Sequence, residues 1–221
     1  MIQANDCVVV ADAIGRLFAA AGLPWPPPAR RTVVPVPLDV LIRTYNLAHD
    51  EVPGLSRAAA GAYLARWGVQ RPELLEDASP LAGFLFANAH GGYILVNADD
   101  ALPRRRFTAA HELGHYLLHF LPRLQAARDV ETCLVQDDSG EMVREEDKLD
   151  ADNKLSLPEM ERQANRFAAE LLMPEAVCRT ATDLYAARFR TPLRFREHHL
   201  ASELLVSREA VRWRLRELNL T

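Results

Sequence analysis

The stretch His111-Glu112-Leu113-Gly114-His115 matches the H-E-x-x-H pattern and lies in a segment with helical periodicity. Residues four apart share one face of a helix, so the two imidazoles can converge on one metal ion. Glu112 lies about 100° round the helix and can reach a water molecule beside that ion. Because five residues match by chance in roughly one chain in a hundred of this size, the surrounding sequence must decide whether the motif holds a metal.

Composition bounds the kind of protein. The chain has 221 residues, 49% of them hydrophobic, and a formal net charge of −4. This length supports one sizeable core, and the negative charge argues against a surface built wholesale for polyanions. Cys7, Cys133 and Cys178 lie far apart without C-x-x-C spacing, which indicates a reducing compartment. With no basic leader and no apolar run of about 18 residues, we expect a cytoplasmic protein without membrane contact.

The sequence before the motif predicts three helices and a hairpin. Apolar residues at helical spacing indicate helices over 8–22, 38–47 and 56–67, and the Pro-rich run 24–28 forbids continuation of the first. Two β-prone runs within 83–97, separated by a short turn that contains glycine, indicate a hairpin. This hairpin leads directly into the motif helix.

The motif helix is expected to end at Phe120, because Pro122 cannot continue it. Residues 129–152 hold ten acidic residues against two basic ones, which we interpret as a solvated loop. Ser156-Leu157-Pro158-Glu159 is a capping box with proline in the first turn, and it predicts a helix that Pro174 closes. A further helix over 175–188 and a helix-turn-helix pattern around Val206-Ser207 complete the chain.

A catalytic zinc ion needs a third protein ligand besides the two histidines. The metzincin solution is excluded, because Leu121 stands six residues after His115, where another histidine is needed. His119 lies about 12 Å along the helix axis from His111, too far to complete the same site. We therefore expect His119 to pack or to support the site from outside.

Glu161 is the better candidate for the third ligand. Asn165 lies four residues later on the same helix face, so a ligating carboxylate and a hydrogen-bonding amide would reach the metal helix together. Glu159 and Glu170 are the competitors, and Glu170, nine residues on, falls on the opposite face.

Two segments together strongly resemble the ImmA/IrrE family of metallopeptidases: residues 106–119, RFTAAHELGHYLLH, and residues 161–174, ERQANRFAAELLMP. An E-x-x-x-(D/N) helix after H-E-x-x-H is also the arrangement of thermolysin-like gluzincins. The resemblance covers about residues 36–174 and extends more loosely to 206–211. The acidic segment and the Pro-rich extension depart from the family pattern, and both can alter substrate choice.

The resemblance implies an α+β fold in three parts. A mostly helical, zincin-like metallopeptidase domain with a small β-sheet or hairpin would occupy 33–188. An N-terminal helix with its Pro-rich linker would occupy 1–32, and a helix-turn-helix-like helical region 189–221. The resemblance also implies limited proteolysis of a helix-turn-helix repressor, which relieves repression during stress or mobile-element induction.

The expected site is a Zn²⁺ ion held by His111, His115 and Glu161, with a water molecule in the fourth position. Glu112 would act as the general base, and Asn165 would support the ligands by hydrogen bonding. Two imidazoles and a carboxylate favour zinc, while manganese and iron stay open. The enzyme would be a metalloendopeptidase.

Substrate contacts are harder to derive. Tyr93, Leu95 and Asn97 lie on the second hairpin strand, whose backbone edge could pair with an extended peptide. No motif identifies the donor that stabilises the oxyanion. The downstream candidates are Tyr185, His198 and His199.

The tail supports a rival reading, in which the chain is a DNA-binding regulator with a degenerate or structural metal site. The arginines that could contact phosphate are Arg208, Arg212, Arg214 and Arg216. We favour the peptidase, because all site residues are present and the net charge is negative. In a third reading the chain is the toxin or regulator of a two-gene, toxin–antitoxin-type cassette that docks on its repressor partner.

Overall fold

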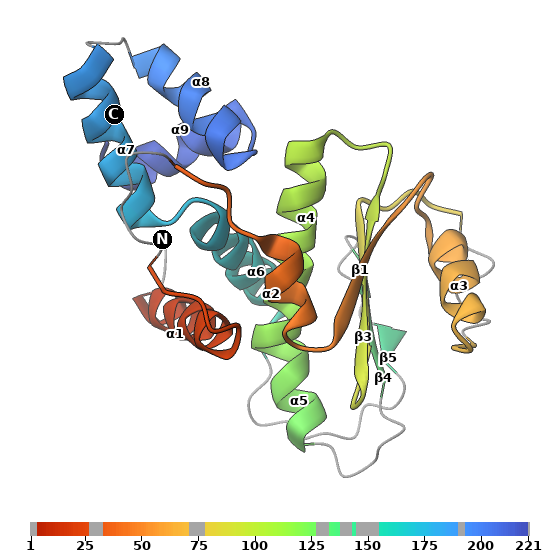
Figure 1. Ribbon diagram of the computed structural model, residues 1–221. Helices are drawn as coiled ribbons and strands as arrows, with labels where there is room; N and C mark the ends of the chain where they lie inside the picture. Colours follow the sequence, from red (N-terminus) through yellow and green to blue (C-terminus); the bar gives the residue numbers. More distant parts are fainter. Residues whose placement is uncertain are drawn as a thin grey trace.

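The computed structural model describes residues 4–26, 33–70, 78–126, 133–137, 143–144, 155–189 and 193–220. A mixed β-sheet stands between helix α3 on one face and the helices that carry the H-E-x-x-H motif on the other (Figure 1). The predicted class, a mostly helical α+β fold with a small sheet, is confirmed.

The sheet is built on the predicted hairpin. Its strands are β1 Leu47–Val52, β2 Gly83–Asn88, β3 Gly91–Asn97, β4 Cys133–Asp137 and β5 Val143–Arg144. They lie in the order β1-β3-β2-β4-β5. β1 runs parallel to β3, and the other neighbouring strands are antiparallel.

Alternation along β2 separates two hydrophobic clusters, because successive side chains of a strand point to opposite faces of the sheet. Phe84 and Phe86 pack in the cluster that contains Leu64 of α3 (Arg57–Arg66). Leu85, between them, belongs to the larger cluster that contains Leu113 of the motif helix. The sheet therefore supports the motif helix on one face only.

The remaining helices carry the motif and the two ends of the chain. They are α1 Ala4–Ala20, α2 Leu38–Arg43, α4 Leu102–His115, α5 Leu121–Ala126, α6 Leu157–Leu172, α7 Glu175–Phe189, α8 Leu193–Leu204 and α9 Arg208–Glu217. No helix in the described ranges is both long enough and apolar enough to cross a lipid bilayer.

The motif helix is longer than predicted. After α4 the chain continues through a π-helical turn, η2 (Tyr116–Phe120), directly into α5. The prediction that the helix ends at Phe120 because of Pro122 is wrong. The wide π turn, whose hydrogen bonds reach five residues back, precedes the proline and accommodates its ring and its missing N–H.

The helix predicted over 38–47 is also too long. α2 ends at Arg43, Asn46 turns the chain with a φ of 56°, and β1 follows. The acidic segment predicted as a loop contains β4, which pairs with β2. The residues of that segment outside β4 and β5 lie beyond the described ranges.

Both ends of the chain pack into the main core. Leu17 of α1, Leu204 of α8 and Leu215 of α9 belong to the same hydrophobic cluster as Phe167 of α6. The boundaries predicted after residues 32 and 188 stay predictions, and residues 27–32 of the Pro-rich linker lie outside the described ranges.

Candidate metal centre

Helices α4 and α6 pack tightly against each other at a glycine of the motif. A Cβ atom added to Gly114 would lie 3.0 Å from Cδ1 and 3.2 Å from Cβ of Phe167, whose side chain is fully buried. These contacts are tighter than ordinary packing, so any side chain here would press against Phe167, whereas glycine fits without a shift. This approach brings the histidine face of α4 against Glu161 and Asn165 of α6.

The three predicted metal ligands converge. The Nε2 atoms of His111 and His115 lie 2.9 Å apart. The two carboxylate oxygens of Glu161 lie 3.3 Å from Nε2 of His111 and 3.2 Å from Nε2 of His115. Ligand atoms of all three residues lie within 4.8 Å of one another, so they can hold one metal ion.

These separations fit a tetrahedral zinc site. Bonds of about 2.0–2.1 Å from zinc to nitrogen or oxygen place ligand atoms about 3.3 Å apart at the corners of a tetrahedron. In the structure the two nitrogens lie 2.9 Å apart, and they lie 3.3 and 3.2 Å from different oxygens of the Glu161 carboxylate. Three protein ligands leave the fourth corner to water or substrate, as in catalytic zinc sites.

Hydrogen bonds behind the ligands orient both imidazoles. Nδ1 of His111 lies 3.2 Å from the amide oxygen of Asn165, which can only accept, so Nδ1 carries the proton. Nδ1 of His115 lies 3.1 Å from Nδ1 of His119 on η2. With a proton on Nδ1 of His111 and on Nδ1 of His115, the Nε2 lone pair of each of these two rings faces the space between the ligands.

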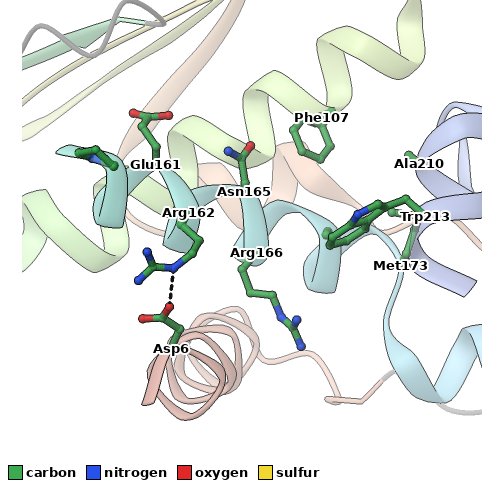
Figure 2. Close-up of a pocket in the computed structure, with 11 residues that line it drawn as sticks. Asp6, Phe107, Glu161, Arg162, Asn165, Arg166, Met173, Ala210 and Trp213 are labelled. Atoms are coloured by element: carbon green, nitrogen blue, oxygen red, sulfur yellow. Dashed lines mark hydrogen bonds and ion pairs between the residues drawn. The ribbon is translucent and has the colours of Figure 1, made fainter. Parts of the chain in front are cut away.

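His119 is the first member of a buried chain of hydrogen bonds. Its Nε2 donates to the side-chain oxygen of Gln163 at 3.2 Å, and the Gln163 amide donates to Asp6 of α1 at 2.9 Å. Nδ1 of His119 is thereby left to accept the proton of His115. Asp6 also pairs with Arg162 at 2.8 Å (Figure 2). We call His119, Gln163 and Asp6 the Asp6 relay.

Two members of the Asp6 relay were not predicted. Gln163 leaves a signal in the sequence, because it is a polar residue on the buried face of α6, beside Met160 and Phe167. Asp6 leaves none, since it stands 157 positions before its partner. For His119, the expected role outside the ligand set agrees with its position.

Burial decides the charge state of the rings. It lowers the pKa of His115, and together with the proximity of His115 it lowers the pKa of His119 to about 3. Both rings are therefore neutral at pH 7, as ligation and the relay require. Burial raises the pKa of Glu161, but in the metal-free chain the neighbouring nitrogens of His111 and His115 outweigh it and hold that pKa well below its usual range.

The other carboxylates near the two motifs, those of Glu112, Glu159 and Glu170, each have a different environment. Glu112 is 1% exposed, which shields its carboxylate from bulk water. Glu159 accepts the backbone N–H of Ser156 at 2.9 Å as part of the capping box. Glu170 pairs with Arg214 of α9. The competitors of Glu161 are thus occupied away from the histidines.

The proposed substrate strand does not have a free edge. β3, with Tyr93, Leu95 and Asn97, pairs with β1 on one side and β2 on the other. The expectation that a peptide adds to β3 is therefore wrong, because both rows of backbone groups are already bonded. Tyr93 and Leu95 pack in the cluster around α3, and the Asn97 amide donates to the carbonyl of Leu81.

The candidates for the oxyanion donor lie in the C-terminal helices. The hydroxyl of Tyr185 donates to Glu203, and the ring of His199 lies 6.0 Å from the ring of Tyr185 and next to His198. None of the three belongs to the metal cluster. Their role as oxyanion donors stays a prediction.

Not all four arginines of α9 are available for contact with phosphate. Arg214 is fully buried and pairs with Glu170 and Glu217, so the expectation that it contacts phosphate is wrong. Arg212 lies 3.4 Å from Glu197 of α8. The other two predicted arginines, Arg208 and Arg216, are exposed.

Comparison with known proteins agrees with this geometry. The family model Peptidase M78, described as an IrrE N-terminal-like domain, matches residues 77–216. A search of curated proteins gives no match. The matched range contains both motif helices and extends through most of α9, whereas the sequence resemblance reached firmly only to residue 174.

Proposed function

The chain belongs to the Peptidase M78 family of metallopeptidases, and from that premise we propose that it is a zinc-dependent endopeptidase. One observation carries the proposal. Nitrogen atoms of His111 and His115 and the carboxylate of Glu161 lie about one tetrahedral edge apart, with each histidine oriented from behind.

The residues around the metal site would have separate roles in the reaction. A zinc ion, when bound, supplies Lewis acidity that acidifies water and polarises a peptide carbonyl. Glu112 would accept the proton of the attacking water and deliver it to the leaving nitrogen. Asn165 and the Asp6 relay would keep both Nδ1 atoms protonated, so that each Nε2 stays available to the ion.

We further propose that the substrate is a helix-turn-helix repressor whose limited proteolysis relieves transcriptional repression. Support comes from the resemblance to ImmA/IrrE metallopeptidases and from the family match. A stress response or induction of a mobile element would then be the setting.

Metal analysis tests the zinc site, and cleavage of a co-expressed helix-turn-helix repressor tests the proposed substrate. We expect one zinc ion per chain, cleavage by the wild type, and a loss of activity of about 10²- to 10⁴-fold in Glu112→Gln with the metal retained. His115→Ala should lose the metal as well. Full activity of Glu112→Gln with metal bound would contradict the role of Glu112, and a metal-free wild type would contradict the zinc site.

Fewer arginines support DNA binding in the structure than in the sequence. α8 and α9 are consecutive helices joined by a short turn, with Ser207 as the N-cap of α9. However, one of its four candidate arginines is buried and another lies beside a glutamate. We therefore keep DNA binding as the second candidate.

A further inference from the structure

An apolar groove continues from the metal centre along the joint between α4 and α6. It has a volume of about 660 Å³ and is open to the surface. Pro158 and the ligand Glu161 line it near the start of α6, and Asn165, Ala169 and Met173 follow along the helix. Figure 2 shows Trp213 reaching from α9 toward α6, so that α9 forms the far wall. We call this feature the apolar groove.

The floor of the apolar groove follows a single face of α6. Glu161, Asn165 and Ala169 are spaced by four residues, so they lie within about 80° of one another round the helix, and Met173 follows the last helical residue, Leu172. Twelve residues of helix rise about 18 Å. An extended peptide rises about 3.3 Å per residue, so a segment of about five residues would reach from the ligand Glu161 to the far end.

The walls of the far end are large and apolar. Phe107 stands four residues before His111, on the same face of α4. Trp213 is 53% exposed, although tryptophan is usually well covered in folded chains. Aromatic side chains around a concave apolar site are typical of residues that dominate binding.

The two arginines that line the groove are already paired with carboxylates. Arg162 pairs with Asp6, and Arg166 pairs with Glu217. These cations are thus engaged with carboxylates of the chain itself. The groove therefore favours an apolar side chain over an acidic one.

We propose that the apolar groove binds an extended segment of the protein substrate and selects a large apolar side chain about five residues from the cleaved bond. This inference rests on the proposed peptidase function. It gives α9 a part in substrate selection, because Trp213 and Ala210 of α9 line the groove.

Cleavage of a peptide library by the full chain tests the preference. We expect peptides with Leu, Met, Phe or Trp four or five residues from the cut to be processed about tenfold faster than peptides with Ser there. Trp213→Ala should reduce this ratio to about threefold or less, and Ala210→Phe, which fills the groove, should do the same. Trp67→Ala is the matched control, because Trp67 is a 62% exposed tryptophan on the α3 side of the sheet, and it should keep the ratio.

Binding to the Glu112→Gln variant separates this inference from the proposed function. The probe is a fluorescein-labelled 12-residue Gly-Ser peptide with a leucine at every fourth position, compared with its all-serine counterpart. Tighter binding of the leucine peptide that Trp213→Ala abolishes supports the groove, even if the wild type cleaves nothing. Cleavage with an unchanged preference in Trp213→Ala overturns the groove alone. A change from dimer to monomer in Trp213→Ala, with peptide binding unaltered, would assign the groove to a second copy and also overturn the inference.

Discussion

His119 determines the orientation of His115 without contacting the proposed metal. Its Nδ1 accepts from Nδ1 of His115 at 3.1 Å inside the core, and Gln163 fixes which nitrogen of His119 carries the proton. Replacing His119 by Phe keeps a ring but removes the acceptor. We expect zinc to bind about 10- to 100-fold more weakly, as measured by competition with a chelator at constant pH.

The matched variant for this prediction is His119→Asn, whose amide oxygen takes the approximate place of Nδ1. We expect it to recover most of the affinity, because the His115 proton again has an acceptor. Equal zinc affinity in His119→Phe and the wild type would show that the relay does not act on the ligand. Far-UV circular dichroism checks that both variants are folded.

His119 should also make the metal-free protein sensitive to acid. Its pKa falls from 6.5 to about 3 on folding, so between these values the unfolded chain binds a proton that the native chain does not. Stability is therefore fully present above pH 6.5 and is lost as pH falls toward 3, by up to about 1.4 kcal/mol per pH unit. Urea titrations in a chelator should show a shallower pH slope for His119→Asn, and parallel slopes would contradict the assignment.

At the scale of elements, Gly114 sets the distance between α4 and α6. Alanine is the better helix former, but its Cβ would lie 3.0 to 3.2 Å from the fully buried Phe167, which would have to shift by a few tenths of an ångström within the core. We expect Gly114→Ala to lower the free energy of unfolding by about 1–3 kcal/mol and to weaken zinc binding, because His115 moves away from Glu161. Thermal unfolding with and without zinc measures both effects.

Gly15 of α1 supplies the control for this prediction. A Cβ atom there meets nothing within 4 Å, so Gly15→Ala should be stabilising by roughly 0.5–1 kcal/mol through helix propensity alone. If Gly114→Ala were stabilising as well, the contact between α4 and α6 would have room for an added methyl group.

The sequence predicts those elements that local chemistry specifies. Ser56 accepts the N–H of Ala59 at the start of α3, and the capping box at Ser156 starts α6. β1 was missed, because it exists through pairing with β3, about 45 positions later in the chain. The same distant pairing removed the free edge expected for the hairpin. The π turn before Pro122 was missed because a proline normally ends a helix.

The residues of the candidate site likewise fall into those that the sequence predicts and those that it does not. His111 and His115 share a face because they are four apart, and Glu161 follows from the need for a third ligand on the next amphipathic helix. Asp6 could not be found, since its contact with Gln163 depends on how α1 packs against α6. Helix periodicity fixes ligands within a helix, but not partners between distant helices.

At the scale of the whole molecule, the C-terminal helices are joined to the peptidase core by charge as well as by apolar packing. Arg214 of α9 pairs with Glu170 of α6 and also donates to the carbonyl of Met173 at 3.1 Å. Removing one partner from such a buried pair is strongly destabilising. This arginine is therefore part of the architecture that places Trp213 beside the groove.

This use of arginine limits DNA binding. Each phosphate contact changes the logarithm of the affinity by about −0.9 per logarithm of the salt concentration. Raising salt from about 50 to about 200 mM would weaken binding about 150-fold if all four α9 arginines contacted phosphate. The loss would be about 12-fold for Arg208 and Arg216 alone, because Arg214 is buried and the exposed Arg212 lies beside Glu197. We expect fluorescence anisotropy with a labelled duplex to show no binding or a loss of about 12-fold at most. A loss near 150-fold would mean that Arg214 leaves Glu170, so that α9 separates from α6 when the protein binds DNA.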